Sequence, residues 1–204
     1  MKDFIYQKDL SLDGALCDRI IEIFETNKDE QFKGVLGGSY GLKSGSVVDI
    51  ITKDTTDCNI ISSSARILEW QPIICILIKE LEANLQNYIE KLETTLHLSL
   101  NDIYKSKAID TFLIHKYEKG KGKFLYHNDF YIDRDRGKYR ILNYMWYLND
   151  VIDGGETEFF GYYKIKPQKG KMIIFPSEWF FPHCGKMPIS DDKYVITGWV
   201  YVDM

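Results

Sequence analysis

The ten residues YRILNYMWYL, Tyr139–Leu148, carry apolar or aromatic side chains at almost every position. Successive side chains of a β-strand point to opposite faces, so a strand with this sequence is apolar on both faces. We expect such a strand inside a sheet, with a barrel interior on one side and a helix covering the other. The segment therefore predicts a β-structured core with helices packed outside it.

Other short runs with high β-propensity follow Ser106, and turn-forming segments rather than helices separate them. Strands at this spacing predict an antiparallel sandwich or barrel. The runs are AIDTFLIHKY (108–117), FLYHNDF (124–130), KMIIFP (171–176) and KYVITGWVYV (193–202).

The first half of the chain is predicted to be mainly helical. Apolar residues recur at helical spacing from Leu12 to about Thr26, with Ser11 or Asp13 available as the N-cap. A longer helix is expected to begin near Pro72, with one apolar stripe packed against the sheet. The stripe comprises Ile74, Leu77, Ile78, Leu81, Leu85, Tyr88, Ile89 and Leu92.

No internal repeat and no linker divides the 204 residues, and an apolar content of 45% is sufficient for one core. We expect a single domain, residues 1–204, which is mainly β with N-terminal helices. Residues 1–105 are predicted to be mainly helical support and loops, and residues 106–204 to be the β-structured core. Gly34–Asp57 is rich in Gly and Ser, which predicts a loop with short strands.

Composition narrows the function classes. The net charge of −4 gives no support to a general nucleic-acid-binding protein. No apolar run is long enough to cross a membrane, and the N-terminal MKDFIYQKDL has acidic groups where a signal peptide has an apolar stretch. Four scattered cysteines without C-x-x-C spacing indicate reduced thiols, so we expect a cytoplasmic protein. Only five of its 26 basic residues are arginine, which is compatible with an AT-rich genome and a virus-encoded protein.

Two potential metal ligands stand two residues apart in a strand-like segment, His127 and Asp129. Such residues share one face of a strand and can bind one ion from the same side. His183 follows after 56 positions and completes a set of two imidazoles and one carboxylate. This set favours non-haem Fe(II) with open coordination positions, and zinc is the main rival.

Lys193 lies ten positions after His183, on the same predicted strand face as Thr197 and Trp199. If that face is interior, the Lys193 ammonium is buried and needs an anionic partner. A dicarboxylate bound to the metal at one end would supply that partner at its other end. His115 and Tyr117 share a face of another predicted strand, and we interpret His115 as a hydrogen-bonded core histidine rather than a pocket residue.

Five segments follow one another between Ala108 and Val202: HKYEKG, HND, RILNYMWYLNDVIDGGETEF, IKPQKGKMIIFP and HCGKMPISDDKYVITGW. Together they resemble ordered motifs of the prolyl 4-hydroxylase-like 2-oxoglutarate/Fe(II) dioxygenases. The corresponding patterns are Y-x-x-G, H-x-D, R-x-x-T-x-L-x-Y-L-N-x-x-x-x-G-G-E-T-x-F, P-x-x-G-x-x-x-x-F and H-x-G…K-x-x-x-x-x-W. Two positions depart from the family, since Asn143 replaces Thr and Met145 replaces a frequent Leu.

The resemblance implies a double-stranded β-helix of the jelly-roll or cupin-like type, covered by helices. It implies that His127, Asp129 and His183 bind Fe(II) and are catalytic. The presence of Asp129 implies hydroxylation, because halogenating relatives replace this carboxylate. 2-Oxoglutarate, with O2 and with ascorbate as reductant, would give succinate and CO2. The residues implied to bind 2-oxoglutarate are Lys193, Tyr117, Thr197 and Trp199.

The implied substrate is a protein or peptide, and we expect a proline within a Pro-rich chain. The candidate residues on the substrate side are Tyr131, Arg140 and Trp179, beneath a flap formed by Gly34–Asp57. Three alternatives stay open. The same chemistry could act on a lysyl residue, a small molecule or a nucleobase; the protein could be a zinc or iron enzyme that uses no 2-oxoglutarate; or it could be a non-catalytic jelly-roll binding protein.

Overall fold

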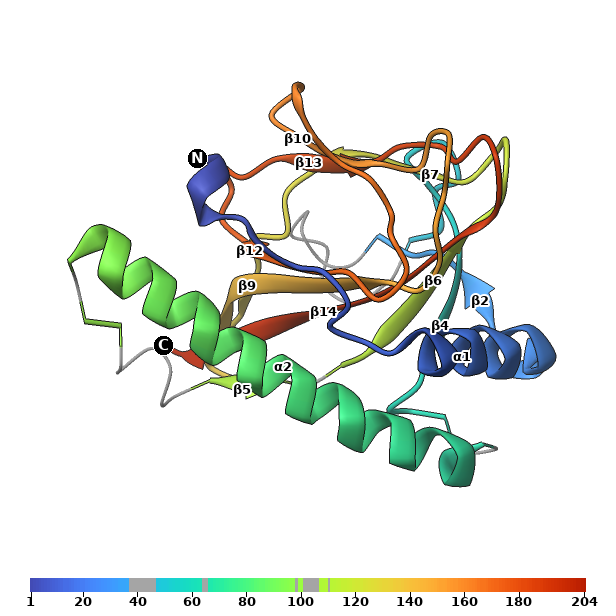
Figure 1. Ribbon diagram of the computed structural model, residues 1–204, viewed down its shortest axis with the longest axis horizontal. Helices are drawn as coiled ribbons and strands as arrows, with labels where there is room; N and C mark the ends of the chain where they lie inside the picture. The colour runs from blue at the N-terminus through green and yellow to red at the C-terminus, as the bar shows by residue number, and fades with distance from the viewer. Residues whose placement is uncertain (37–46, 64–65, 98, 101–106, 110) are drawn as a thin grey trace.

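Two antiparallel sheets lie face to face in the computed structural model of the protein, which describes residues 1–36, 47–63, 66–97, 99–100, 107–109 and 111–204. In Figure 1 the smaller sheet lies above the larger one, and the helices α1 and α2 lie below the larger sheet. This arrangement confirms the predicted helix-covered jelly roll.

The large sheet has the strand order β1-β12-β9-β14-β6-β4-β2, and two short strands pair outside this path, β5 with β14 and β8 with β9. Its long central strands β9 and β14 pair over most of their lengths. The bounds are β1 Tyr6–Lys8, β12 Met172–Pro176, β9 Lys138–Tyr147, β14 Lys193–Asp203, β6 Leu113–Tyr117, β4 Thr56–Asn59, β2 Phe32–Lys33, β5 Ala108–Ile109 and β8 Ile132–Asp133.

The small sheet has the strand order β11-β10-β13-β7-β3. Its strands have two to five residues each, and β10, β11 and β13 lie in segments for which the sequence pattern predicted no strand. A strand of three residues is too short to show a period of two. The bounds are β11 Tyr163–Ile165, β10 Thr157–Phe159, β13 His183–Gly185, β7 Lys123–His127 and β3 Lys53–Asp54.

Strand β9 is buried on both faces, as its sequence predicted. Tyr144 and Trp146 belong to the hydrophobic cluster that the large sheet forms with the helices. Met145 and Tyr147 alternate with them and belong to a second cluster between the sheets. The same alternation divides β14, so the large sheet separates the helix-covered core from the interior that contains the site.

Helix α1 extends over Gly14–Thr26, and Asp13 is its N-cap, accepting hydrogen bonds from the backbone N–H groups of Ala15 and Leu16. Helix α2 extends over Ile67–Leu96, so Pro72 lies in its second turn rather than at its start. The predicted apolar stripe of α2 is buried except at one position, Ile78, which is 38% exposed. Two 3-10 turns complete the described helical elements, η1 Lys2–Phe4 and η2 Lys28–Glu30.

Both halves of the chain contribute to both sheets. Strands β1 to β4 come from residues 1–105, and three of them, β1, β3 and β4, pair with strands of residues 106–204. This interleaving supports our proposal that the chain is one domain, although the first half is less purely helical than predicted. No helix among the described residues has the length and apolar content required to cross a membrane.

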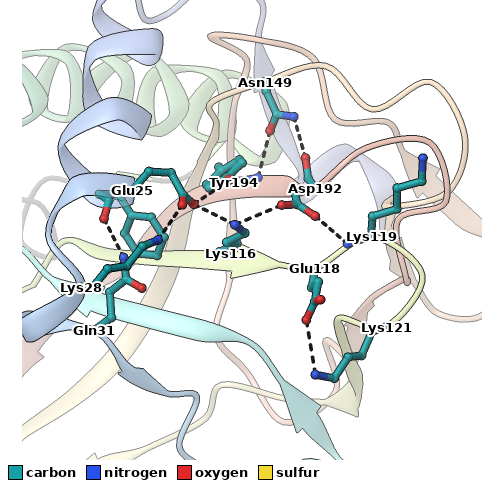
Figure 2. Close-up of polar contacts among 11 residues, drawn as sticks. Glu25, Lys28, Gln31, Lys116, Glu118, Lys119, Lys121, Asn149, Asp192 and Tyr194 are labelled. Carbon is teal, nitrogen blue, oxygen red and sulfur yellow. Dashed lines mark hydrogen bonds and ion pairs between the residues drawn. The ribbon is translucent and has the colours of Figure 1, made fainter.

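A polar network fixes the end of α1 to the outer face of the large sheet (Figure 2). Lys116 on β6 lies 2.8 Å from a Glu25 carboxylate oxygen and 3.1 Å from one of Asp192. The Tyr194 hydroxyl donates to the same Glu25 oxygen at 2.7 Å, and the Asn149 side chain accepts from the Tyr194 backbone N–H. Because Lys116 and Tyr194 are register partners, the network holds the end of β6 against the start of β14.

Leu81→Ala should lower the free energy of unfolding by about 2–5 kcal/mol, since Leu81 is fully buried between α2 and the sheet. Ile78→Ala, in the same helix but on its exposed face, should cost about 1 kcal/mol or less. Urea unfolding of both variants measures the difference. Equal losses would contradict the buried face assigned to α2.

Candidate active site

A cavity of about 610 Å³ lies between the two sheets. Its lining includes all three candidate metal ligands together with residues from β6, β9 and β14 of the large sheet. The site is therefore built from segments that are far apart in the sequence and that only the two-sheet arrangement brings together.

The structure brings His127, Asp129 and His183 together. His127 ends β7 and His183 begins β13, and the two residues are direct register partners. Asp129 follows His127 by two residues, and its Oδ2 lies 3.3 Å from His183 Nε2. One potential ligand atom from each of the three residues lies within 4.8 Å of the other two, which is a spacing that one metal ion can bridge.

The two imidazoles are oriented by backbone carbonyls. His127 Nδ1 lies 2.7 Å from the Leu125 carbonyl oxygen, and His183 Nδ1 lies 3.4 Å from that of Phe181. A proton on each Nδ1 suits these contacts and leaves the Nε2 lone pair available to a metal. The donor set therefore fits a bound ion.

Asp129 is oriented by Asn143, whose Nδ2 donates a hydrogen bond to Asp129 Oδ2. The Asn143 Oδ1 in turn accepts from the Thr197 hydroxyl at 3.2 Å. Asn143 stands where the motif that the sequence resembles has Thr, and here its amide connects the carboxylate on one side to β14 on the other. No feature of the sequence signals the contact between Asn143 and Thr197, because that contact depends on the register of β9 with β14.

Burial and mutual proximity set the protonation states. Burial, together with the neighbouring His183, lowers the pKa of His127 to about 3. Burial also lowers the pKa of His183. For Asp129, burial acts to raise the pKa, but the two imidazoles and the Arg140 guanidinium outweigh it and hold the pKa below its ordinary value. At neutral pH the site therefore presents two neutral imidazoles and one carboxylate.

Lys193 lies in the interior at the first position of β14, with 1% exposure, so the condition under which its ammonium needs a partner is met. Its Nζ donates to the Gly155 carbonyl oxygen at 2.9 Å and lies 3.8 Å from the centre of the Tyr117 ring. Tyr117 lines the cavity, whereas Lys193 lies beside this ring and outside the lining. Among the described residues no carboxylate lies within ion-pair distance of the ammonium, and burial lowers its pKa to about 7.

The other predicted site residues separate into two groups. Thr197, Trp199 and Arg140 line the cavity, and the Arg140 guanidinium lies 3.9 Å from the centre of the Trp199 ring. Tyr131 is outside the lining but lies beneath Arg140 at 4.8 Å. Trp179 is also outside the lining and is 67% exposed.

A cluster of three buried polar residues, Lys53, Asp57 and His115, lies at the cavity wall, and only His115 was identified from the sequence. Asp57 Oδ2 lies 2.9 Å from Lys53 Nζ, and Asp57 Oδ1 lies 2.6 Å from His115 Nδ1. All three residues are buried, and Lys53 and His115 line the cavity. His115 is thus both a partnered core histidine and a pocket residue. The Gly34–Asp57 segment, predicted as a flap, contributes Lys53 and Asp57 to this wall, and residues 37–46 of it lie outside the described residues.

Comparison with known families matches residues 112–201 to the 2OG-Fe(II) oxygenase superfamily. This part of the chain is therefore similar to that superfamily, as the sequence motifs implied. The similarity implies Fe(II) and 2-oxoglutarate, and the His-Asp-His group is a set of residues that could hold the metal ion. No curated protein matches the chain.

Solved prolyl hydroxylases share the fold. The viral collagen prolyl hydroxylase of Paramecium bursaria Chlorella virus-1, in complex with 2OG, is 17% identical, with 98% of this chain and 96% of that chain covered and a TM-score of 0.59. A Pseudomonas putida prolyl-4-hydroxylase is 18% identical, with 98% and 93% covered and a TM-score of 0.59. A Trichoplax adhaerens prolyl hydroxylase, in complex with a hypoxia inducible factor peptide fragment, is 17% identical, with 98% and 84% covered and a TM-score of 0.64.

Metal-free protein should lose stability as the pH falls below about 6.5, the ordinary pKa of histidine. In the unfolded chain His127 takes up a proton near that value, whereas burial lowers its pKa in the folded chain to about 3. Its contribution to stability is therefore complete above the upper value and is lost as the pH falls toward the lower one. His127→Gln should reduce the slope of unfolding free energy against pH by up to about 1.4 kcal/mol per pH unit. Urea unfolding at several pH values in this window measures the slope for the parent protein and for His127→Gln. Equal slopes would contradict a neutral His127 imidazole in the folded protein.

Proposed function

We propose that the enzyme hydroxylates prolyl residues in an extended, Pro-rich polypeptide, with Fe(II) held by His127, Asp129 and His183. The observation that carries the proposal is the convergence of these three donors at a cavity wall, with both Nε2 atoms available. The chemistry that Fe(II) supplies when bound is the activation of O2, one oxygen atom of which enters a substrate C–H bond while 2-oxoglutarate is oxidised to succinate and CO2.

Lys193 is proposed to bind the distal carboxylate of 2-oxoglutarate. Its buried ammonium has a carbonyl and an aromatic ring as partners, but no carboxylate among the described residues. A second carboxylate on the cosubstrate would compensate this charge in the interior. Tyr117, Thr197 and Trp199 line the cavity and are proposed to contact the cosubstrate.

The substrate proposal is supported by the sequence motifs and by the character of the cavity wall. The Arg140 guanidinium, a planar cation, lies within cation–π distance of the Trp199 and Tyr131 rings. Proline-rich chains are already close to polyproline II, lose little conformational entropy on binding and pack well on aromatic surfaces. The exposed Trp179 is a further candidate for contact with such a chain. We propose ascorbate as the reductant that keeps the iron ferrous.

Lys193→Ala should raise the KM for 2-oxoglutarate at least tenfold. Removing one partner of a buried charge-assisted contact costs about 2–5 kcal/mol, and about 1.4 kcal/mol corresponds to a factor of ten. Lys193→Arg should be partly competent, because it keeps the charge but changes the donor geometry. Succinate release at varied 2-oxoglutarate measures both variants. An unchanged KM in Lys193→Ala would place the cosubstrate elsewhere.

The substrate is tested by incubating the enzyme with Fe(II), ascorbate, 2-oxoglutarate and matched peptides that contain either repeated proline or repeated lysine. We expect a mass gain of one oxygen atom, localised to proline by fragmentation, and succinate formed in equal amount. Nucleosides and free amino acids serve as the other acceptors. Succinate formed only with lysyl, nucleobase or small-molecule acceptors would overturn the prolyl assignment and leave the oxygenase class intact.

A further inference from the structure

Strand β7 contains an irregularity next to the metal ligands. His127 pairs with His183, and Phe124 pairs with Gly185, so three steps along β7 correspond to two steps along β13. An extra residue in one strand turns side chains that would otherwise point to opposite faces onto the same side. The Phe124 and His127 rings accordingly stack, with centroids 3.5 Å apart and planes 12° apart.

The buried ammonium of Lys53 lies close to the same phenyl ring. Lys53 on β3 is the register partner of Phe124, and its Nζ lies 5.2 Å from the ring centroid. This distance is within the range of a cation–π contact, which is strengthened when the cation is withdrawn from water. Lys53 is 4% exposed, so the contact is desolvated.

Asp57 fixes the position of the Lys53 ammonium. The chain passes from the small sheet to the large sheet at Thr55, between β3 and β4, and the Asp57 carboxylate reaches back across this corner to Lys53 at 2.9 Å. On its other side Asp57 contacts His115, its register partner on β6. A continuous series of contacts therefore leads from the large sheet through Asp57, Lys53 and Phe124 to the metal-facing imidazole.

Stability alone is a weak reason for this buried ion pair, because the desolvation of two charges commonly cancels their attraction. Among the residues that the structure describes, the His127 ring has one hydrogen bond, from Nδ1 to the Leu125 carbonyl, and a single bond leaves the ring plane free to tilt about that axis. A ring stacked at 3.5 Å removes this freedom. Groups that fix the orientation of a metal ligand in this way contribute to metal affinity without touching the metal.

We propose that Lys53 and Phe124 are positioning residues that hold the His127 ring in the orientation required for metal binding, with Asp57 keeping Lys53 in place. The inference rests on the proposed role of His127 as a metal ligand. Phe124 acts directly on the imidazole, and Lys53 acts through Phe124.

The test is a double-mutant cycle on metal-free protein titrated with Co(II), an ion whose ligand-field absorption reports the geometry of its ligands. Lys53→Met and Phe124→Leu should each weaken Co(II) binding about 10- to 100-fold and alter the absorption spectrum. Because both residues act on one imidazole, the double variant should bind no more weakly than the weaker single variant. Lys123→Met, the same substitution on the neighbouring residue of β7, should leave affinity and spectrum unchanged.

Additive losses, or a parental affinity and spectrum in Lys53→Met, would overturn the inference. If Lys53→Met does not fold, Lys53→Met combined with Asp57→Leu removes the unpaired carboxylate and gives the same test, while Lys53→Arg should restore parental binding. His127→Ala separates the two proposals. If His127→Ala retains Co(II), the proposed metal site fails; if it loses Co(II) while the Lys53 and Phe124 variants bind as the parent does, only the positioning role fails.

Discussion

His127 and His183 face each other across two neighbouring strands of the small sheet; His183 is buried and His127 is half-buried. Two imidazoles so placed cannot both carry a proton without a large electrostatic cost, so the interior keeps them neutral and suited to bind a metal. Asp129, whose pKa lies below its ordinary value and which is close to the Arg140 guanidinium, supplies the negative charge of the site. The rest of the fold serves to keep these three groups together and away from bulk water.

The large sheet makes this possible because its two faces have different roles. Tyr144 and Trp146 face the helices and contribute to the main core, whereas Met145 and Tyr147 face the cavity. The polar network of Lys116, seen in Figure 2, secures the outer face where β6 meets β14. On the inner face of the same two strands lie Tyr117 and Lys193, so the contacts that anchor α1 also define the end of the cavity proposed for 2-oxoglutarate.

Features that depend on neighbouring residues could be predicted from the sequence, whereas features that depend on contacts between distant segments could not. The long strands β9 and β14, the two helices and the H-x-D pair were predictable, because periodicity and local spacing are recorded in consecutive residues. The strands β10, β11 and β13 were not, since three residues show no period and form only where a partner strand is supplied. Lys53 and Asp57 were missed for a related reason: four positions apart in a segment that resembles a loop, they meet only because the chain changes sheets at Thr55.

Each metal-ligand candidate is oriented by its own neighbouring groups. A backbone carbonyl and a stacked phenyl ring contact His127, a second carbonyl contacts His183, and the Asn143 amide contacts Asp129. Asn143 comes from the large sheet, whereas the two carbonyls belong to the segments of the small sheet. The relative position of the two sheets therefore sets the distance between the carboxylate and the imidazoles, and a contact that joins the sheets, such as that of Asp57 with Lys53, influences the site although it lies outside it.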